Sequence, residues 1–135
     1  MDLERLTPEA LIENFALLGE WEARYGYVLD LGKQLTPFPE SEKTEANKVQ
    51  GCVSQVWLLP VATASEKIDF VADSDSHIVR GLIAILKIVY GGRTKEEIAA
   101  FDMEAYFARL GLSEHLSPNR RSGFFAMVAR IKAMG

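Results

Sequence analysis

Hydrophobic residues recur with a helical period at both ends of the chain and with a strand-like period in its middle. Near the start, Thr7 and Pro8 are typical of a helix N-terminus. The apolar residues that follow lie three or four positions apart: Leu11, Ile12, Phe15 and Leu18. After Gly19, a second amphipathic stretch runs over residues 21–35, and the prolines in residues 36–39 end it because proline cannot continue a helix. Two helices are therefore predicted here.

The middle of the chain has the pattern of strands. Residues 53–61 carry apolar side chains at both odd and even positions, which predicts a strand covered on both faces. Residues 67–72 alternate between apolar and charged, which predicts a half-buried strand antiparallel to the first across a turn at 62–66. Residues 47–50 predict a third short strand, and the polar stretch 36–46 before it predicts a surface loop.

The second half returns to a helical pattern. Residues 73–76 offer cap residues for a helix that Gly91-Gly92 ends. Residues 94–97 form a capping-box pattern that opens a shorter helix, and another short helix is expected over 103–109. Ser117-Pro118 opens the last helix, which has a stripe of apolar residues best interpreted as core packing: Phe124, Phe125, Met127, Val128 and Ile131. The predicted fold is α+β, with a small antiparallel sheet of about three strands packed by helices from both the N- and C-terminal parts.

Composition narrows the class of protein. The 135 residues are 48% hydrophobic, which suits a single domain spanning residues 1–135. The net charge of −4 argues against nucleic acid as a partner, because that would need a basic surface. No apolar run approaches the roughly 18–20 residues that span a bilayer, and the N-terminus lacks the pattern of a signal peptide. With one cysteine there is no internal disulfide, so a cytoplasmic protein is expected.

The chemistry of the chain centres on its single cysteine. Gly51 and Cys52 lie where a polar loop turns into a strand, and the glycine permits a turn that leaves room beside the sulfur. A free thiol has a pKa of about 8.5 and can attack a sulfur already activated elsewhere, without metal or cofactor. Cysteine is also a common buried, inert residue. Position alone therefore leaves a reactive and a structural Cys52 equally open.

The residues around Cys52 carry a family resemblance. Residues 50–57, Gln-Gly-Cys-Val-Ser-Gln-Val-Trp, resemble the signature of the SufE family, sulfur acceptors for cysteine desulfurases in iron–sulfur cluster assembly. Further blocks resemble the family in order and nearly in spacing: Asn14-Phe15, Trp21-Glu22 to Leu31-Gly32, Asp73-Ser74-Asp75, Ile78 to Ala84, Phe101-Asp102, and Leu116 to Arg120 followed by Gly123. Together they cover almost the whole chain. Val53 and Ser76-His77 depart from the usual family pattern, which puts the choice of partner in doubt.

The resemblance implies a SufE/IscU-like fold in which Cys52 forms a persulfide, on a loop whose sulfur can tuck into an apolar pocket. It implies a SufS-like or CsdA-like cysteine desulfurase as donor and a SufBCD-like scaffold complex as recipient. The desulfurase holds pyridoxal phosphate, and this chain is expected to need no cofactor of its own. Whether the chain forms a homodimer is left open by the sequence.

Residues near Cys52 in sequence or motif are candidates for loop support or partner contact: Gly51, Ser54, Gln55, Asp75 and Arg120. Arg120 matches the family's Pro-x-Arg element, and either favours the thiolate, contacts the partner, or makes an ordinary surface ion pair. Asp73 and Asp75 contact the partner or, as we favour, cap the following helix. Ser54 and Gln55 either hydrogen-bond the loop backbone or have a purely structural role.

Two other function classes remain beside the sulfur carrier. One is a regulator that binds a desulfurase without carrying sulfur. The other is a stand-alone thiol enzyme, either a peroxidase or a hydrolase that needs a histidine beside Cys52. The two histidines, His77 and His115, stand in no recognisable motif. One cysteine and two scattered histidines make a zinc site or an iron–sulfur cluster held by this chain alone improbable.

Overall fold

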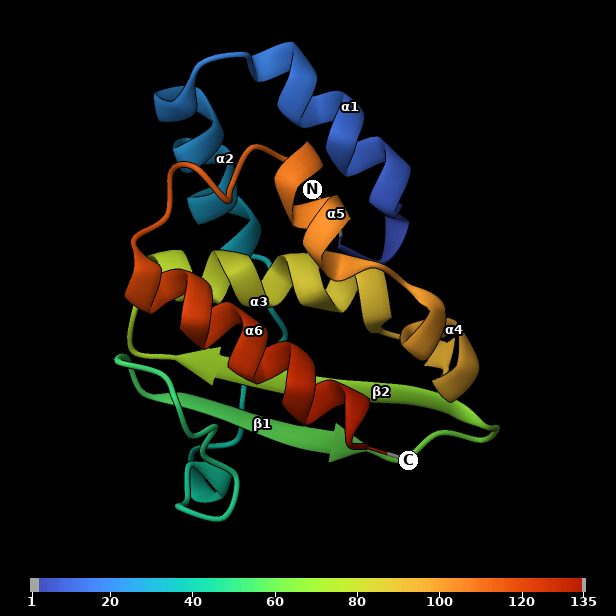
Figure 1. Cartoon of the computed structure of the whole chain (residues 1–135). Coiled ribbons are helices and arrows are strands. Elements are labelled where there is room, and N and C mark those ends of the chain that lie inside the picture. The colour runs from blue at the N-terminus through green and yellow to red at the C-terminus, as the bar shows by residue number, and fades with distance from the viewer. Residues whose placement is uncertain (1–2, 135) are drawn as a thin grey trace.

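Three layers make up the fold (Figure 1). A computed structural model describes residues 3–134. An antiparallel sheet forms the first layer, and α3 (His77–Tyr90) and α6 (Pro118–Lys132) lie over one face of it. The helices α1 (Pro8–Leu18), α2 (Trp21–Gly32) and α5 (Met103–Arg109) lie on the far side of α3. The remaining helices are α4 (Lys95–Ala100) and two short 3-10 helices, η1 (Leu3–Arg5) and η2 (Glu40–Glu42). The predicted α+β fold is confirmed.

The sheet has three strands in the order β1-β2-β3. β1 (Val56–Val61) pairs antiparallel with β2 (Lys67–Ser74), so that Val56 lies opposite Ser74 and Val61 opposite Asp69. β3 (Arg93–Thr94) pairs with Lys67 and Ile68 on the other edge of β2. Side chains facing the helices are buried: Val56, Leu58, Ile68, Phe70, Ala72 and Ser74. The antiparallel pair was predicted correctly.

Two details of the predicted sheet are wrong. β1 is not covered on both faces, because Trp57 and Leu59 on the face away from the helices are only half-buried. Residues 47–50 form no strand; Lys48 makes one isolated bridge to Trp57, and the chain then turns away into a loop. The third strand is β3, which follows the turn at Gly91-Gly92.

The predicted starts of α1, α4 and α6 agree with the side chains that cap them, whereas α2 ends at Gly32, before the prolines that were expected to end it. Thr7 accepts a hydrogen bond from the backbone N–H of Ala10, and Ser117 accepts one from Arg120. Thr94 and Glu97 form the capping box at the start of α4. Each bond satisfies a backbone N–H that the first helical turn leaves without an intrahelical partner.

α3 is the central helix and packs closely on α2. The approach depends on glycine, because a Cβ added at Gly81 would lie 2.2 Å from the backbone oxygen of Val28. On its other side α3 packs against β2 and α6. The α6 stripe is core as predicted, with Phe124, Met127 and Ile131 buried. Across residues 3–134, no helix has both the length and the apolar composition needed to cross a membrane.

Candidate functional site

Cys52 lies on a short loop that is closed at its base by backbone pairing. The N–H of Val49 donates to the carbonyl of Val56 and the N–H of Leu58 donates to the carbonyl of Asn47, both at 2.8 Å. Between these bonds, Gly51 has a φ of +88°, a left-handed conformation that side chains disfavour. The loop therefore holds Cys52 beside a rigid sheet edge, as predicted from its sequence position.

The thiol of Cys52 points against α6. Its Sγ lies 3.5 Å from the carbonyl oxygen of Gly123, to which the S–H donates a weak hydrogen bond. A Cβ added at Gly123 would lie 3.4 Å from this sulfur and 3.7 Å from the Cα of Cys52. These are van der Waals distances, so the thiol packs directly against the first half of α6.

A small apolar cavity adjoins the thiol. Its walls are buried side chains from β1, α3 and α6: Val56, Val79, Leu82, Phe124 and Met127. Ser54 and Arg120 line it near the surface. The volume is about 20 Å³, and a cavity needs at least about 10–15 Å³ to hold one water molecule. There is room beside Cys52 for one further atom of about that size.

Burial of the side chain raises the pKa of the Cys52 thiol. The thiol is half-buried among apolar residues, and a low dielectric disfavours the charged thiolate. At neutral pH the free protein therefore holds a smaller thiolate fraction than an exposed cysteine would. This is the opposite of the acidic thiols of stand-alone cysteine enzymes.

We expect the alkylation of native Cys52 by iodoacetamide to have a midpoint pH above that of an ordinary thiol, about 8.5. Because the pKa is raised in the folded state, the unfolded state loses its proton first as pH rises. The contribution of Cys52 to the free energy of unfolding is therefore fully present below the pKa that the thiol has in the unfolded state. This contribution is lost as the pH rises through the pKa that the thiol has in the folded state. The same chain in denaturant serves as control, and a native midpoint below the denatured one would contradict this account.

Asp75 fastens the Cys52 loop to the junction of β2 and α3, while Asp73 links β2 to other parts of the chain. Asp75 accepts a hydrogen bond from the backbone N–H of Gln55 at 3.1 Å and donates its own N–H to the Gln55 carbonyl at 3.3 Å. Asp73 forms ion pairs with Arg80 at 3.1 Å and Lys43 at 3.4 Å. The favoured capping role for both is wrong, because Asp73 belongs to β2 and Ser76 accepts the capping bond of α3.

Replacing Asp75 with alanine is expected to speed alkylation of Cys52 by about fivefold, because one charge-assisted anchor of the loop is lost at an exposed position. Asp75→Asn is the matched control, since its amide oxygen can still accept from Gln55. Alkylation rates at a fixed pH measure the effect. Equal rates in Asp75→Ala and the unchanged protein would mean that this bond does not restrain the loop.

A family model identifies the chain. The SufE model, described as an Fe-S metabolism associated domain, matches residues 9–134. The chain belongs to the SufE family. Its role therefore lies in iron–sulfur metabolism, with a partner from that metabolism such as a cysteine desulfurase.

Relatives of this SufE-family chain match it along nearly its whole length. An uncharacterised SufE-like protein of Rhizobium meliloti (strain 1021) is 46% identical over 128 residues, covering 93% of this chain and 91% of the relative. A second one from Rhizobium etli is 44% identical over 127 residues, covering 92% and 86%. The fold matches the solution structure of a hypothetical protein from Thermus thermophilus at a TM-score of 0.72. That structure is 19% identical and the match covers 95% of this chain and 94% of the other.

The predicted supporting residues of this SufE-family chain gather around the thiol to different degrees. Ser54 and Arg120 line the cavity of Cys52, and Gly51 provides the turn. Gln55 acts through its backbone rather than its side chain. Arg120 is exposed at the rim, in the first turn of α6.

Neither histidine lines the cavity of Cys52. His77 is exposed at the first position of α3, and His115 stacks on the ring of Trp21 with centroids 4.5 Å apart. Within residues 3–134, no group of three His, Cys, Asp or Glu side chains is placed to hold a metal ion.

Sequence reasoning missed the role of two residues at the site. Gly123 belongs to the blocks that resemble the family, but its contact with the thiol was not predicted. A further signal for it is a glycine inside a helix, where glycine costs roughly 0.5–1 kcal/mol relative to alanine. Arg130 donates to the carbonyls of Lys48 at 3.2 Å and Ala46 at 3.0 Å, which ties the base of the loop to α6. No sequence pattern indicates that second contact.

Proposed function

We propose that this protein accepts sulfur from a cysteine desulfurase on Cys52, stimulates that enzyme by removing its persulfide, and delivers the sulfur to an iron–sulfur cluster scaffold. The donor is a SufS-like or CsdA-like enzyme and the recipient a SufBCD-like complex. The observation that carries the proposal is a half-buried thiol beside an apolar cavity with room for about one more atom. Membership in a family of iron–sulfur metabolism supports it.

The transfer is a thiol–disulfide type exchange that needs no oxidant. The thiolate of Cys52 attacks the outer sulfur of the donor's cysteine persulfide, and the bond between the two donor sulfurs breaks. The donor cysteine leaves as a thiolate and takes up the proton that Cys52 gave up. The product is a persulfide on Cys52, whose outer sulfur we place in the small cavity between α3 and α6.

Cys52 reaches a donor only if its loop moves outward, and the loop is built for a low cost of movement. At its tip Gln50 and Gly51 are exposed, and Val53 is 80% exposed. The thiol makes one weak hydrogen bond, to Gly123, besides its contacts with the apolar walls of the cavity. Segments with few buried apolar contacts open at low free energy.

The raised pKa of Cys52 disfavours a stand-alone thiol enzyme, which needs a thiolate before any partner arrives. A hydrolase of the cysteine–histidine type would also need a histidine as base, and the cavity is lined by none. In a carrier, activation is supplied by the donor, whose sulfur–sulfur bond is already reactive.

The function is tested by measuring the turnover of a cysteine desulfurase with cysteine and reductant, in the presence and absence of this protein. We expect acceleration by the unmodified protein and none by protein alkylated at Cys52. Equal stimulation by the alkylated protein would contradict the role of a sulfur carrier and would indicate a regulator that acts by binding alone. Turnover of cysteine without any desulfurase would contradict both.

A further inference from the structure

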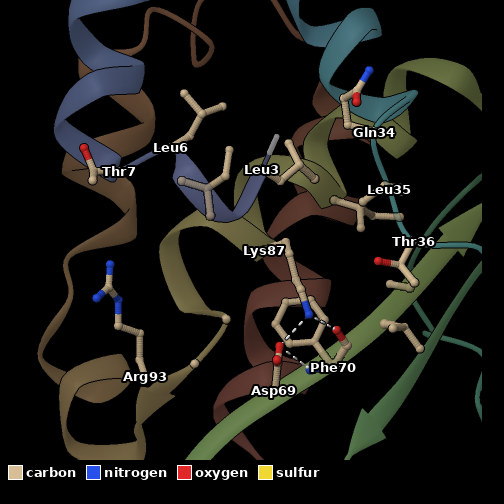
Figure 2. A pocket seen from close by; sticks show the side chains of 16 residues that line it. Leu3, Leu6, Thr7, Gln34, Leu35, Thr36, Asp69, Phe70, Lys87 and Arg93 are labelled. Atoms are coloured by element: carbon tan, nitrogen blue, oxygen red, sulfur yellow. Dashed lines mark hydrogen bonds and ion pairs between the residues drawn. The ribbon is translucent and has the colours of Figure 1, made fainter. Parts of the chain in front are cut away.

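A second cavity lies on the opposite flank of α3, and none of its residues also lines the cavity of Cys52. It is enclosed by the N-terminal segment, the chain that follows α2, the edge of β2 and the last turns of α3 (Figure 2). Its volume is about 480 Å³, within the range of roughly 300–1,000 Å³ typical of small-molecule sites. The proposed sulfur transfer does not use this space.

One side of this second cavity is apolar. Leu3 and Leu6 approach from the N-terminal segment and Leu35 from the chain after α2, as Figure 2 shows. Ile83 and Ile88 of α3 complete the apolar lining. Leu6 and Leu35 are only half-buried, so part of their surface is open to a molecule in the cavity. The wall suits a hydrocarbon group.

The polar side of the cavity carries two cations and one carboxylate. The half-buried ammonium of Lys87 is bound to the carboxylate of Asp69 and donates to the carbonyl of Phe70 (Figure 2). Arg93 donates its Nε–H to the carbonyl of Val89 at 3.2 Å, and a guanidinium has further N–H groups to offer. Glu97, the capping carboxylate of α4, lies near Arg93 without lining the cavity. Among the described residues that line the cavity, the cations are therefore Lys87, which Asp69 already binds, and Arg93, whose guanidinium keeps N–H groups to offer.

At Phe70, the edge of β2 facing the cavity is blocked to an added strand. β3 pairs only with Lys67 and Ile68, so beyond Ile68 no described strand neighbours this edge. The carbonyl of Ile68 accepts a hydrogen bond from the N–H of Gly92 on this edge. Because the backbone groups of successive strand residues point to opposite edges, Phe70 is the next residue that points to this edge. The N–H of Phe70 donates to the carboxylate of Asp69, and the carbonyl of Phe70 accepts from Lys87. Charged side chains on an edge block strand addition, which favours a small molecule over a peptide.

We propose that this cavity binds a small amphiphilic monoanion of the medium-chain carboxylate class. The carboxylate lies at the guanidinium of Arg93, which supplies charge-assisted hydrogen bonds. Lys87 lies apart from Arg93 in Figure 2, with its ammonium turned to Asp69 and Phe70. The hydrocarbon chain lies against Leu6, Leu35 and Ile88. The guanidinium of Arg93 sets the charge of the ligand, and the leucine and isoleucine wall sets its apolar part.

The test is a titration of the full-length, nitrogen-15-labelled protein with octanoate, followed by amide chemical shifts below the micelle concentration. We expect saturable shifts confined to residues around the cavity, such as Thr36, Ala72 and Gly92. Octylammonium, with the same chain and the opposite charge, is expected to cause none of these. Shifts that do not saturate, or equal binding of octylammonium, would overturn the proposal.

Variants of the second cavity test separately whether octanoate binding depends on the cationic side chain and on the open volume. Arg93→Met is expected to weaken octanoate binding about tenfold, and Lys132→Met on exposed α6 surface is the matched control. Leu6→Trp gives an independent test. It fills the cavity without touching a charge and should abolish the octanoate shifts. Undiminished binding in Leu6→Trp and Arg93→Met would place the ligand elsewhere.

Discussion

Replacing Cys52 with serine is expected to reduce the transfer of radiolabelled sulfur from a cysteine desulfurase to background. A serine hydroxyl cannot form a persulfide, and Cys52 is the only cysteine of the chain. The fold should survive, because serine is similar in size and its hydroxyl can donate to the carbonyl of Gly123 in place of the thiol. The label on the protein after incubation with donor and labelled cysteine measures the effect.

Ser54→Ala is the matched control for that loss. Ser54 lines the same cavity and lies two residues away, and the proposed exchange forms and breaks no bond to its hydroxyl. We expect Ser54→Ala to accept sulfur at nearly the normal rate, and both variants to unfold near the temperature of the unchanged protein. Label that persists on Cys52→Ser at the normal level would assign the sulfur to another atom and remove Cys52 from the mechanism.

The largest expected effect on stability is that of Gly81→Ala. The added Cβ would lie 2.2 Å from the backbone oxygen and 2.4 Å from Cγ1 of Val28, so α2 and α3 must separate. Backbone atoms cannot rotate away as a flexible side chain can. We expect the free energy of unfolding to fall by about 3 kcal/mol or more, at the upper end of overpacking effects. Denaturant unfolding measures it.

Gly26→Ala is a control that makes the same glycine-to-alanine change but is expected to shift the free energy of unfolding in the opposite direction. Gly26 lies inside α2, and no atom stands within 4 Å of the Cβ that alanine would add. Alanine is therefore expected to raise the free energy of unfolding by about 0.5–1 kcal/mol through helix propensity alone. If Gly81→Ala matched Gly26→Ala in stability, the close contact between α2 and α3 would be wrong.

Local sequence signals predict most of the fold. The starts of α1, α4 and α6 carry their caps within three or four residues, so Thr7, Thr94 and Ser117 are visible without tertiary information. The third strand was misplaced because β3 is only two residues long and has no period of its own. Residues 47–50 have a better strand pattern, but the chain turns away at Gly51 after a single bridge.

The site was predicted only where the signal is local. Cys52 and Gly51 stand out in the sequence, but the burial that raises the pKa of the thiol comes from α3 and α6, where the contact residue Gly123 lies 71 residues later in the chain. Asp73 is a residue type typical of a helix cap, but in the structure it forms ion pairs, because the register of β2 turns its side chain toward Lys43 and Arg80. Such contacts across the fold leave no pattern in a single sequence.

Whether Cys52 carries sulfur is tested most directly by the mass of the protein after exposure to a cysteine desulfurase and cysteine. The account predicts a gain of one sulfur atom, located by peptide mapping to the fragment with Cys52 and reversed by a thiol reductant. No gain with an active donor, or a gain on a fragment without Cys52, would contradict it.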